Sequence, residues 1–345
     1  MSVLEGSEFP RNAWYVGAWD HEVTREPMRR MLLNEPLVFY RSGKGDPIVL
    51  DDRCPHRYAP LSSGPVVGDA IQCGYHGWEF GPDGACICIP GMDRPLKAAK
   101  VRSYQALERW GWIYVWMGDP DLADEDLLPS FHYMADPAWT GSGELMHVEA
   151  GYHLIRDNLL DLTHAKYVHK TTLATQHVTD YPVQVVEEGR QLFTRRDMLD
   201  VAKASPLFQA AGNFQGRIDH RQNFIFEPPN NILVQTVVES AASENEDIHT
   251  AFKVANALVP ETDSTCHYFW FIMRDFKLDD EDLTEWAFNA NRGAFLEDKT
   301  LIEQQQKLWE TTPNSKAIPY MQDKGVIRAN EIVSDMVAAE RSLPV

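Results

Sequence analysis

Two short segments in the first third of the chain each pair a cysteine with a histidine. The first is Cys54-Pro55-His56, and the second, sixteen residues further on, is Cys73-Gly74-Tyr75-His76. A spacing of two lets both side chains point to one side of an extended segment, whereas a spacing of three suits a tight turn, which Gly74 permits. Thiolate and imidazole groups are metal ligands, so the sequence predicts a site with two Cys and two His donors.

This donor set fits either of two centres, a tetrahedral zinc ion or a Rieske [2Fe–2S] cluster in which two histidines replace two cysteines on one iron. Zinc sites usually pair like with like, Cys with Cys and His with His. Here each half is mixed, which favours the cluster, and a zinc-stabilised binding module is the alternative. Cys86 and Cys88 have strand spacing, and we expect both to be packing residues because four ligands are already present.

A second group of ligand-capable residues lies between Asp157 and His169. Asp161 and His164 are three apart and would share one face of a helix. His164 and His169 are five apart, about 140° around an ideal helix, so they converge only where the helix ends or bulges. Two histidines and one carboxylate form the ligand set of non-haem Fe(II) oxygenases.

The third ligand of such a set is expected from a distant helix, and Asp298 is the candidate. Its helical neighbours at three and four residues are all apolar: Ala294, Phe295, Leu301 and Ile302. A carboxylate on an apolar helix face must be paired or bind a metal, because burying it alone is costly. Glu297 has less apolar neighbours, so Asp298 is preferred, and Asp161 remains open as a further ligand.

The elements that would position these residues differ between the two parts of the chain. Short strand-like runs separated by turn residues fill the first third and indicate a small all-β domain. The acidic, proline-bearing stretch 118–130 marks the boundary, which gives domains 1–130 and 131–345. In the second domain we expect strands and two helices, over 152–169 and over 280–311, the latter with Asp279 or Asp280 as N-cap.

Composition excludes several classes of function. The net charge is −19, from 51 acidic and 32 basic residues, which argues against nucleic acid as a partner. No stretch of about 18 apolar residues is present, which argues against a membrane span. The first twenty residues lack a secretory signal. An odd count of five cysteines argues against a disulfide framework, so we expect reduced thiols and a cytoplasmic protein.

Five segments of the sequence resemble the Rieske non-haem iron oxygenases, such as the oxygenase components of vanillate O-demethylase and dicamba monooxygenase. The segments are FPRNAWYVGAW (9–19), CPHRYAPLSSG (54–64), CGYHGWEF (73–80), DNLLDLTHAKYVH (157–169) and FLEDKTLIEQQQ (295–306). The resemblance implies an α+β chain, with an N-terminal all-β Rieske domain followed by a helix-grip (START-like) antiparallel-sheet catalytic domain with C-terminal helices.

The resemblance also implies a role for each candidate residue. Cys54, His56, Cys73 and His76 would hold the [2Fe–2S] cluster, and His164, His169 and Asp298 would hold the mononuclear Fe(II). Asp161 would bridge that iron to His76 of a neighbouring subunit in a head-to-tail homotrimer, and Asn158 would lie close to the iron.

The activity implied is that of a terminal monooxygenase with O₂ as co-substrate. Electrons would come from NAD(P)H through a ferredoxin or flavin reductase, since no G-x-G-x-x-G after a strand indicates a nicotinamide site in this chain. The favoured reaction is O-demethylation of a methoxylated aromatic acid such as vanillate, with release of formaldehyde. Hydroxylation or N-dealkylation of another small aromatic compound is the alternative, and an electron-transfer protein without the second iron is a third hypothesis.

Overall fold

The computed structural model describes residues 9–170, 178–242, 244, 248–312 and 317–342. Internal contacts divide the chain into two compact units, one of residues 9–128 with 259–262, the other of residues 129–258 with the chain from 263 onward. The predicted boundary between 130 and 131 rested on composition alone. It did not anticipate that 259–262 belongs with the N-terminal unit, where the amides of Leu33 and Asn34 donate to Pro260 O and Glu261 O at 2.8 and 3.0 Å.

The N-terminal unit consists of three small antiparallel sheets with strand orders β1-β11-β10, β2-β3-β4-β9 and β5-β6-β7-β8. Its strands are β1 (Trp14–Trp19), β2 (Met28–Leu32), β3 (Glu35–Arg41), β4 (Pro47–Asp51), β5 (Val66–Val67), β6 (Ala70–Gln72), β7 (Glu79–Phe80), β8 (Cys86–Cys88), β9 (Ser103–Tyr104), β10 (Ala106–Arg109) and β11 (Trp112–Trp116). The all-β character predicted for this part is confirmed.

The C-terminal unit is a seven-stranded antiparallel sheet with the order β12-β18-β17-β16-β15-β14-β13. The strands are β12 (Thr140–Val148), β13 (Gln184–Glu188), β14 (Gln191–Val201), β15 (Ile218–Glu227), β16 (Asn231–Ser240), β17 (His249–Pro260) and β18 (Cys266–Arg274). The helices are α1 (Tyr152–Leu160), α2 (Ala165–Val168), α3 (Pro206–Gly212), α4 (Glu281–Thr311) and α5 (Lys324–Arg341). An antiparallel sheet with C-terminal helices is the fold class that the sequence predicted, and it is confirmed.

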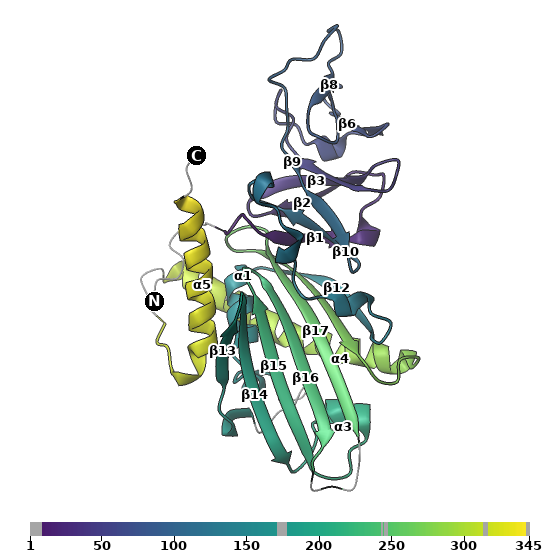
Figure 1. Ribbon diagram of the computed structural model, residues 1–345. Coiled ribbons are helices and arrows are strands. Elements are labelled where there is room, and N and C mark those ends of the chain that lie inside the picture. Colours follow the sequence, from purple (N-terminus) through teal and green to yellow (C-terminus); the bar gives the residue numbers. More distant parts are fainter. Residues whose placement is uncertain (1–8, 171–177, 243, 245–247, 313–316, 343–345) are drawn as a thin grey trace. The chain divides into compact units, whose positions relative to one another are not determined.

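Helix α4 crosses one face of this sheet (Figure 1). It begins where predicted, because the Asp280 carboxylate accepts a hydrogen bond from the Leu283 amide at 2.9 Å and so caps the first turn. Its Phe295 ring lies 5.1 Å from Tyr268 and 5.3 Å from Trp270, both on β18. Burial of these aromatic rings fixes which face of α4 is turned toward the sheet.

The single helix predicted over 152–169 is wrong. Helix α1 ends at Leu160, and Asp161 leaves helical geometry with φ −87° and ψ 92°. The Asp161 carboxylate accepts a hydrogen bond from the Thr163 amide at 2.8 Å. Asp commonly forms this local turn, which competes with the helix for backbone donors. Asp161 and His164 therefore do not share a helix face.

One core cluster of the N-terminal unit includes two of the predicted ligands, Cys54 and Cys73, together with Cys86. Cys86 is thus a packing residue, as expected, but Cys88 is exposed and the same prediction for it is wrong. The register between β7 and β8 shifts at Glu79 and Phe80, so simple alternation does not carry Cys88 to the buried side.

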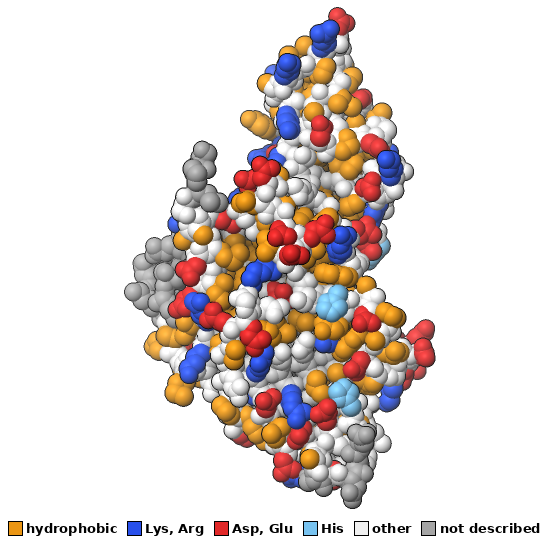
Figure 2. All heavy atoms as spheres, viewed as in Figure 1, with side chains coloured by type: hydrophobic (Ala, Val, Ile, Leu, Met, Phe, Trp, Pro, Cys, Tyr) orange, Lys and Arg blue, Asp and Glu red, His pale blue; other side chains and the backbone are white. Residues whose placement is uncertain are grey.

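The surface carries charges of both signs. On the face drawn in Figure 2, acidic side chains lie among basic ones. Ion pairs such as that between Arg328 and Glu187, 2.7 Å apart, join residues of opposite charge on the surface. Within the described residues, no helix combines the length and the apolar character needed to cross a membrane.

Candidate metal centre

The break between α1 and α2 brings two histidines together. His164 stands immediately before the single turn of α2, and His169 follows that turn directly. Because α2 is only four residues long, the two rings lie 5.1 Å apart between centroids. The sequence required a helix end for these side chains to converge, and the helix end is present.

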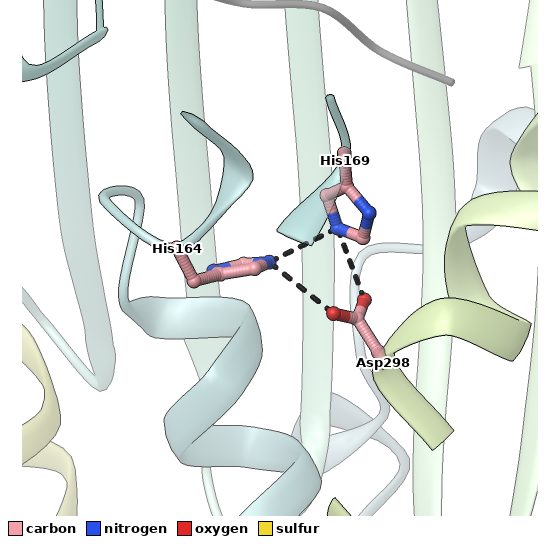
Figure 3. A group of neighbouring side chains, drawn as sticks. All are labelled: His164, His169 and Asp298. Atoms are coloured by element: carbon pink, nitrogen blue, oxygen red, sulfur yellow. Dashed lines mark hydrogen bonds and ion pairs between the residues drawn. The ribbon is translucent and has the colours of Figure 1, made fainter. Parts of the chain in front are cut away.

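Asp298 meets both histidines from the middle of α4 (Figure 3). Its two carboxylate oxygens lie 3.6 Å from His164 Nε2 and 3.3 Å from His169 Nε2, and the two Nε2 atoms are 3.2 Å apart. The ligand atoms of all three residues lie within 4.8 Å of one another. Asp298 is only 5% exposed, so its charge requires compensation in this position.

The protonation pattern of the two histidines favours a cation among these atoms. His164 Nδ1 contacts the Asp161 carbonyl oxygen, and His169 Nδ1 lies 2.9 Å from the Glu297 carboxylate. Both partners are acceptors, so each Nδ1 carries a hydrogen, and a ring without a second proton directs its Nε2 lone pair inward. Two lone pairs and a carboxylate facing one another repel unless a positive charge lies between them. The donor set therefore fits a divalent metal.

The electrostatics of His169 point the same way. Burial lowers the pKa of His169, but the hydrogen bonds and negative charges of Asp298 and Glu297 outweigh burial, and the pKa lies above the ordinary histidine value. The surrounding carboxylates thus attract positive charge to this point. A proton and a metal ion would compete for this position if His169 is a ligand.

Two neighbouring side chains hold the candidate ligands in place. Asn158, on the last turn of α1, donates from Nδ2 to Asp298 Oδ1 at 3.1 Å. Glu297 orients His169 through Nδ1, a role that the sequence did not predict. Its position next to Asp298, which was weighed only as a rival ligand, was the available clue. Asp161 contributes its carbonyl oxygen to His164, while its carboxylate is used in the local turn.

The two Cys–His segments of the N-terminal unit form loops of the same backbone design, here called the cluster loops (54–59 and 73–78). Cys54 N donates to Ala59 O at 2.9 Å, and Cys73 N donates to Trp78 O at 2.7 Å. The fifth residue of each loop has a positive φ, 56° at Tyr58 and 70° at Gly77. Equivalent turns therefore present one cysteine and one histidine each. The tight turn predicted for 73–76 is present, but 54–56 is also a turn, so the extended segment expected there is wrong.

The donors of the cluster loops are sorted by type. Cys54 and Cys73 are buried at 1% and 2% exposure, whereas the His56 and His76 rings are exposed and 4.5 Å apart between centroids. Burial is the main reason that the pKa of the Cys54 thiol is raised to about 11, and the adjacent Cys73 thiol adds to it. A metal would stabilise the thiolates. A buried thiol pair next to an exposed imidazole pair fits a cluster whose two irons take different ligands.

A cavity of about 130 Å³ opens beside the His164–His169–Asp298 group within the C-terminal unit. Most of its wall is apolar, including Leu159, Leu162, Phe252, Val254 and Phe295. The aromatic segment 267–271 of β18 is absent from this lining, and its residues Tyr268, Phe269 and Trp270 are buried in the core, the interpretation that the sequence favoured, whereas Phe271 is half-buried. A mainly apolar pocket that ends on a candidate metal site is suited to a small apolar substrate.

Comparison with known families and proteins covers both units. A model described as a Rieske [2Fe–2S] domain matches residues 13–105, and one described as a vanillate O-demethylase oxygenase C-terminal domain matches residues 148–339.

Curated relatives and solved structures match over most of the chain. The iron–sulfur subunit of the toluene-4-sulfonate monooxygenase system of Comamonas testosteroni is 35% identical over 96% of this chain and 98% of its own length. A vanillate O-demethylase oxygenase subunit from a Pseudomonas strain is 34% identical, covering 96% of each chain. The crystal structure of dicamba monooxygenase bound to dicamba superposes with a TM-score of 0.87 at 30% identity, covering 97% of this chain and 99% of the other.

Proposed function

Since the chain belongs to the Rieske non-haem iron oxygenases, we propose that it is an oxygenase component that removes the methyl group of a methoxylated aromatic compound. It is a monooxygenase whose family uses a [2Fe–2S] cluster and a mononuclear iron. The methyl ether as substrate, the residues that hold each cofactor and the assembly of subunits are the content of the proposal.

The observation that carries the proposal is the apolar cavity that ends on the three inward-facing metal donors. Its volume of about 130 Å³ is close to that of an engineered apolar cavity, about 150 Å³, that binds benzene. The cavity is therefore in the size range of a single aromatic ring, and a substituent on that ring would be directed at His164, His169 and Asp298. A methyl group in that position is the carbon available for oxidation.

The residues assigned to the cofactors are those the sequence singled out. Cys54, His56, Cys73 and His76 would hold the cluster, and His164, His169 and Asp298 would hold the iron. When bound, the cluster supplies single electrons and the iron supplies the capacity to activate O₂. The net reaction consumes the aryl methyl ether, O₂, two electrons and two protons. It yields the phenol, formaldehyde and water, because the hydroxylated methyl group is a hemiacetal that breaks at the bond between ether oxygen and methyl carbon.

The protein contributes orientation and exclusion of water. Glu297 keeps His169 in the tautomer with Nε2 free, and Asn158 fixes one oxygen of Asp298. The apolar side chains of the cavity, among them Phe252 and Phe295, exclude water from the carbon to be oxidised.

We further propose that Asp161 links the two centres between subunits of a homotrimer. Asp161 follows the last turn of α1 and is partly exposed, and His76 is exposed. Contact between Asp161 and His76 of the partner subunit would pass electrons from one centre to the other. A separate ferredoxin or flavin reductase would supply them, in the cytoplasm, where thiols such as the five free cysteines stay reduced. Light scattering on the purified protein measures the subunit number.

The test is release of formaldehyde from a panel of methoxybenzenes and methoxybenzoates, with a surrogate reductase, NADH and O₂. Formaldehyde equal to the phenol formed, absent in Asp298→Ala, supports the proposal. Lack of formaldehyde from every aryl methyl ether would reject demethylation.

Hydroxylation of an aryl methyl group is the second candidate, because the toluene-4-sulfonate system is among the similar proteins. Its product would be a stable benzylic alcohol, since no ether oxygen is present to leave. The same assay with methylbenzenes distinguishes the two reactions by product.

A further inference from the structure

The floor of the cavity is built from neighbouring strands of the sheet. Gln222 on β15 lies opposite Thr236 on β16, which lies opposite Phe252 on β17. The next row on the same face consists of Phe224, Val234 and Val254. All six side chains line the cavity. One end of the floor, at Gln222 and Thr236, is therefore polar in otherwise apolar surroundings.

Helix α4 forms the facing wall. Asn291, Ala294, Phe295 and Asp298 line the cavity, and their spacing of three, four and seven residues places them on one helix face. Asn291 lies two turns from Asp298, about 10 Å along the helix axis at 1.5 Å per residue. The cavity thus carries a metal-facing carboxylate at one level of α4 and a neutral amide at another.

Both amides have a buried atom without a hydrogen-bond partner among the described residues, Gln222 Oε1 and Asn291 Nδ2. Such an atom costs about 1–3 kcal/mol, and buried polar groups in folded proteins usually have partners. Two of them in the wall of one cavity indicate that the missing partner is a ligand. Together they offer both hydrogen-bond donors and acceptors.

The charges around the cavity restrict the ligand further. Among the described lining residues there is no Lys or Arg, and Asp298 is the only carboxylate. An anionic substituent buried beside the two amides would have no cation to pair with, and its desolvation would be uncompensated. A neutral substituent with hydrogen-bonding groups satisfies the amides at no such cost.

We propose that Gln222 and Asn291 bind a neutral hydrogen-bonding substituent of the aromatic substrate, such as a carboxamide, a lactam or a phenolic hydroxyl. The inference rests on the proposed function, in that the ring is taken to present its methyl ether to the metal-facing group. It replaces the methoxylated aromatic acids that the sequence favoured with methoxylated aromatics whose polar substituent in the cavity is neutral.

The test compares three ligands that differ in one substituent: 3-methoxybenzamide, 3-methoxybenzoate and 3-methoxytoluene. Calorimetry on the anaerobic holoenzyme without reductase measures binding separately from turnover. We expect the amide to bind at least about tenfold more tightly than the acid and the toluene, because it gains two hydrogen bonds of ordinary strength that the other two ligands lack.

Two near-isosteric variants remove the amides, Gln222→Met and Asn291→Leu, and each should reduce the preference to less than about threefold. Gln235→Met is the matched control. Gln235 neighbours Thr236 on β16 but faces the other side of the sheet, where it accepts a hydrogen bond from Asn223 at 3.2 Å. This control should bind all three ligands as the unaltered enzyme does.

Three results would overturn the inference: equal or tighter binding of the acid, an unchanged preference in both amide variants, or no binding of the amide at millimolar concentration. Formaldehyde release is measured separately on the same ligands. A clear preference for the amide with no formaldehyde would support this inference and reject demethylation. Formaldehyde from the acid, with no effect of either variant on binding, would support demethylation and reject this inference.

Discussion

Replacing Glu297 with glutamine tests whether a carboxylate outside the three proposed ligands tunes the metal site. Glutamine keeps the length and an oxygen that accepts from His169 Nδ1, which lies 2.9 Å from Glu297 Oε2, and removes only the charge. Loss of such a partner typically weakens metal binding by about 10- to 100-fold. Because the Glu297 side chain is 31% exposed, solvent screens part of its charge. We therefore expect a loss of about tenfold, or about 1.4 kcal/mol.

The assay is competition for Fe(II) between the anaerobic protein and a coloured chelator. Visible absorption of the cluster is an internal control, since the cluster loops belong to the other compact unit and should be unaffected. Glu285→Gln is the matched variant, an exposed glutamate on the same helix. It should bind iron as the unaltered protein does. Equal Fe(II) retention by Glu297→Gln and Glu285→Gln would refute the role assigned to Glu297.

Three further predictions concern the two centres and the fold. Asp298→Ala should lower the iron content from about three to about two per chain, as measured by elemental analysis, with the two cluster irons retained; unchanged iron content and turnover would contradict the ligand assignment. Cys73→Ser should abolish the visible absorption of the cluster, and a spectrum like that of the unaltered protein would exclude Cys73 as a ligand. Burial alone lowers the pKa of His220 to about 3. As the pH falls below about 6.5, His220 therefore takes up a proton only in the unfolded state. This should lower the free energy of unfolding by about 1.4 kcal/mol per pH unit. Urea unfolding between pH 7 and pH 5 should show that the free energy of unfolding falls less steeply with pH in His220→Leu than in the unaltered protein. Equal slopes in the two proteins would show that His220 is not buried as a neutral ring.

Short-range spacing determined much of what could be predicted from the sequence. The Cys–His spacings of two and three residues indicated one thiol and one imidazole on each cluster loop, and they predicted the turn at 73–76 but not the matching turn at 54–56. The α4 cap at Asp280 was predictable from short-range spacing as well. The helix over 152–169 was not, because the turn made by the Asp161 carboxylate prevailed over helical periodicity.

The approach of Asp298 to His164 and His169 was inferred from an apolar helix face and a family resemblance, but the distances depend on how α4 packs on β18. The same packing turns Glu297 toward His169 Nδ1, a contact for which the sequence offered only the adjacency of Glu297 to Asp298. Gln222 and Asn291 face one cavity only because β15 and α4 meet across it. Local spacing thus fixed which donors lie on which loop or helix. Burial of apolar surface between distant segments decided which donors meet, because that burial depends on the whole chain and not on neighbouring residues.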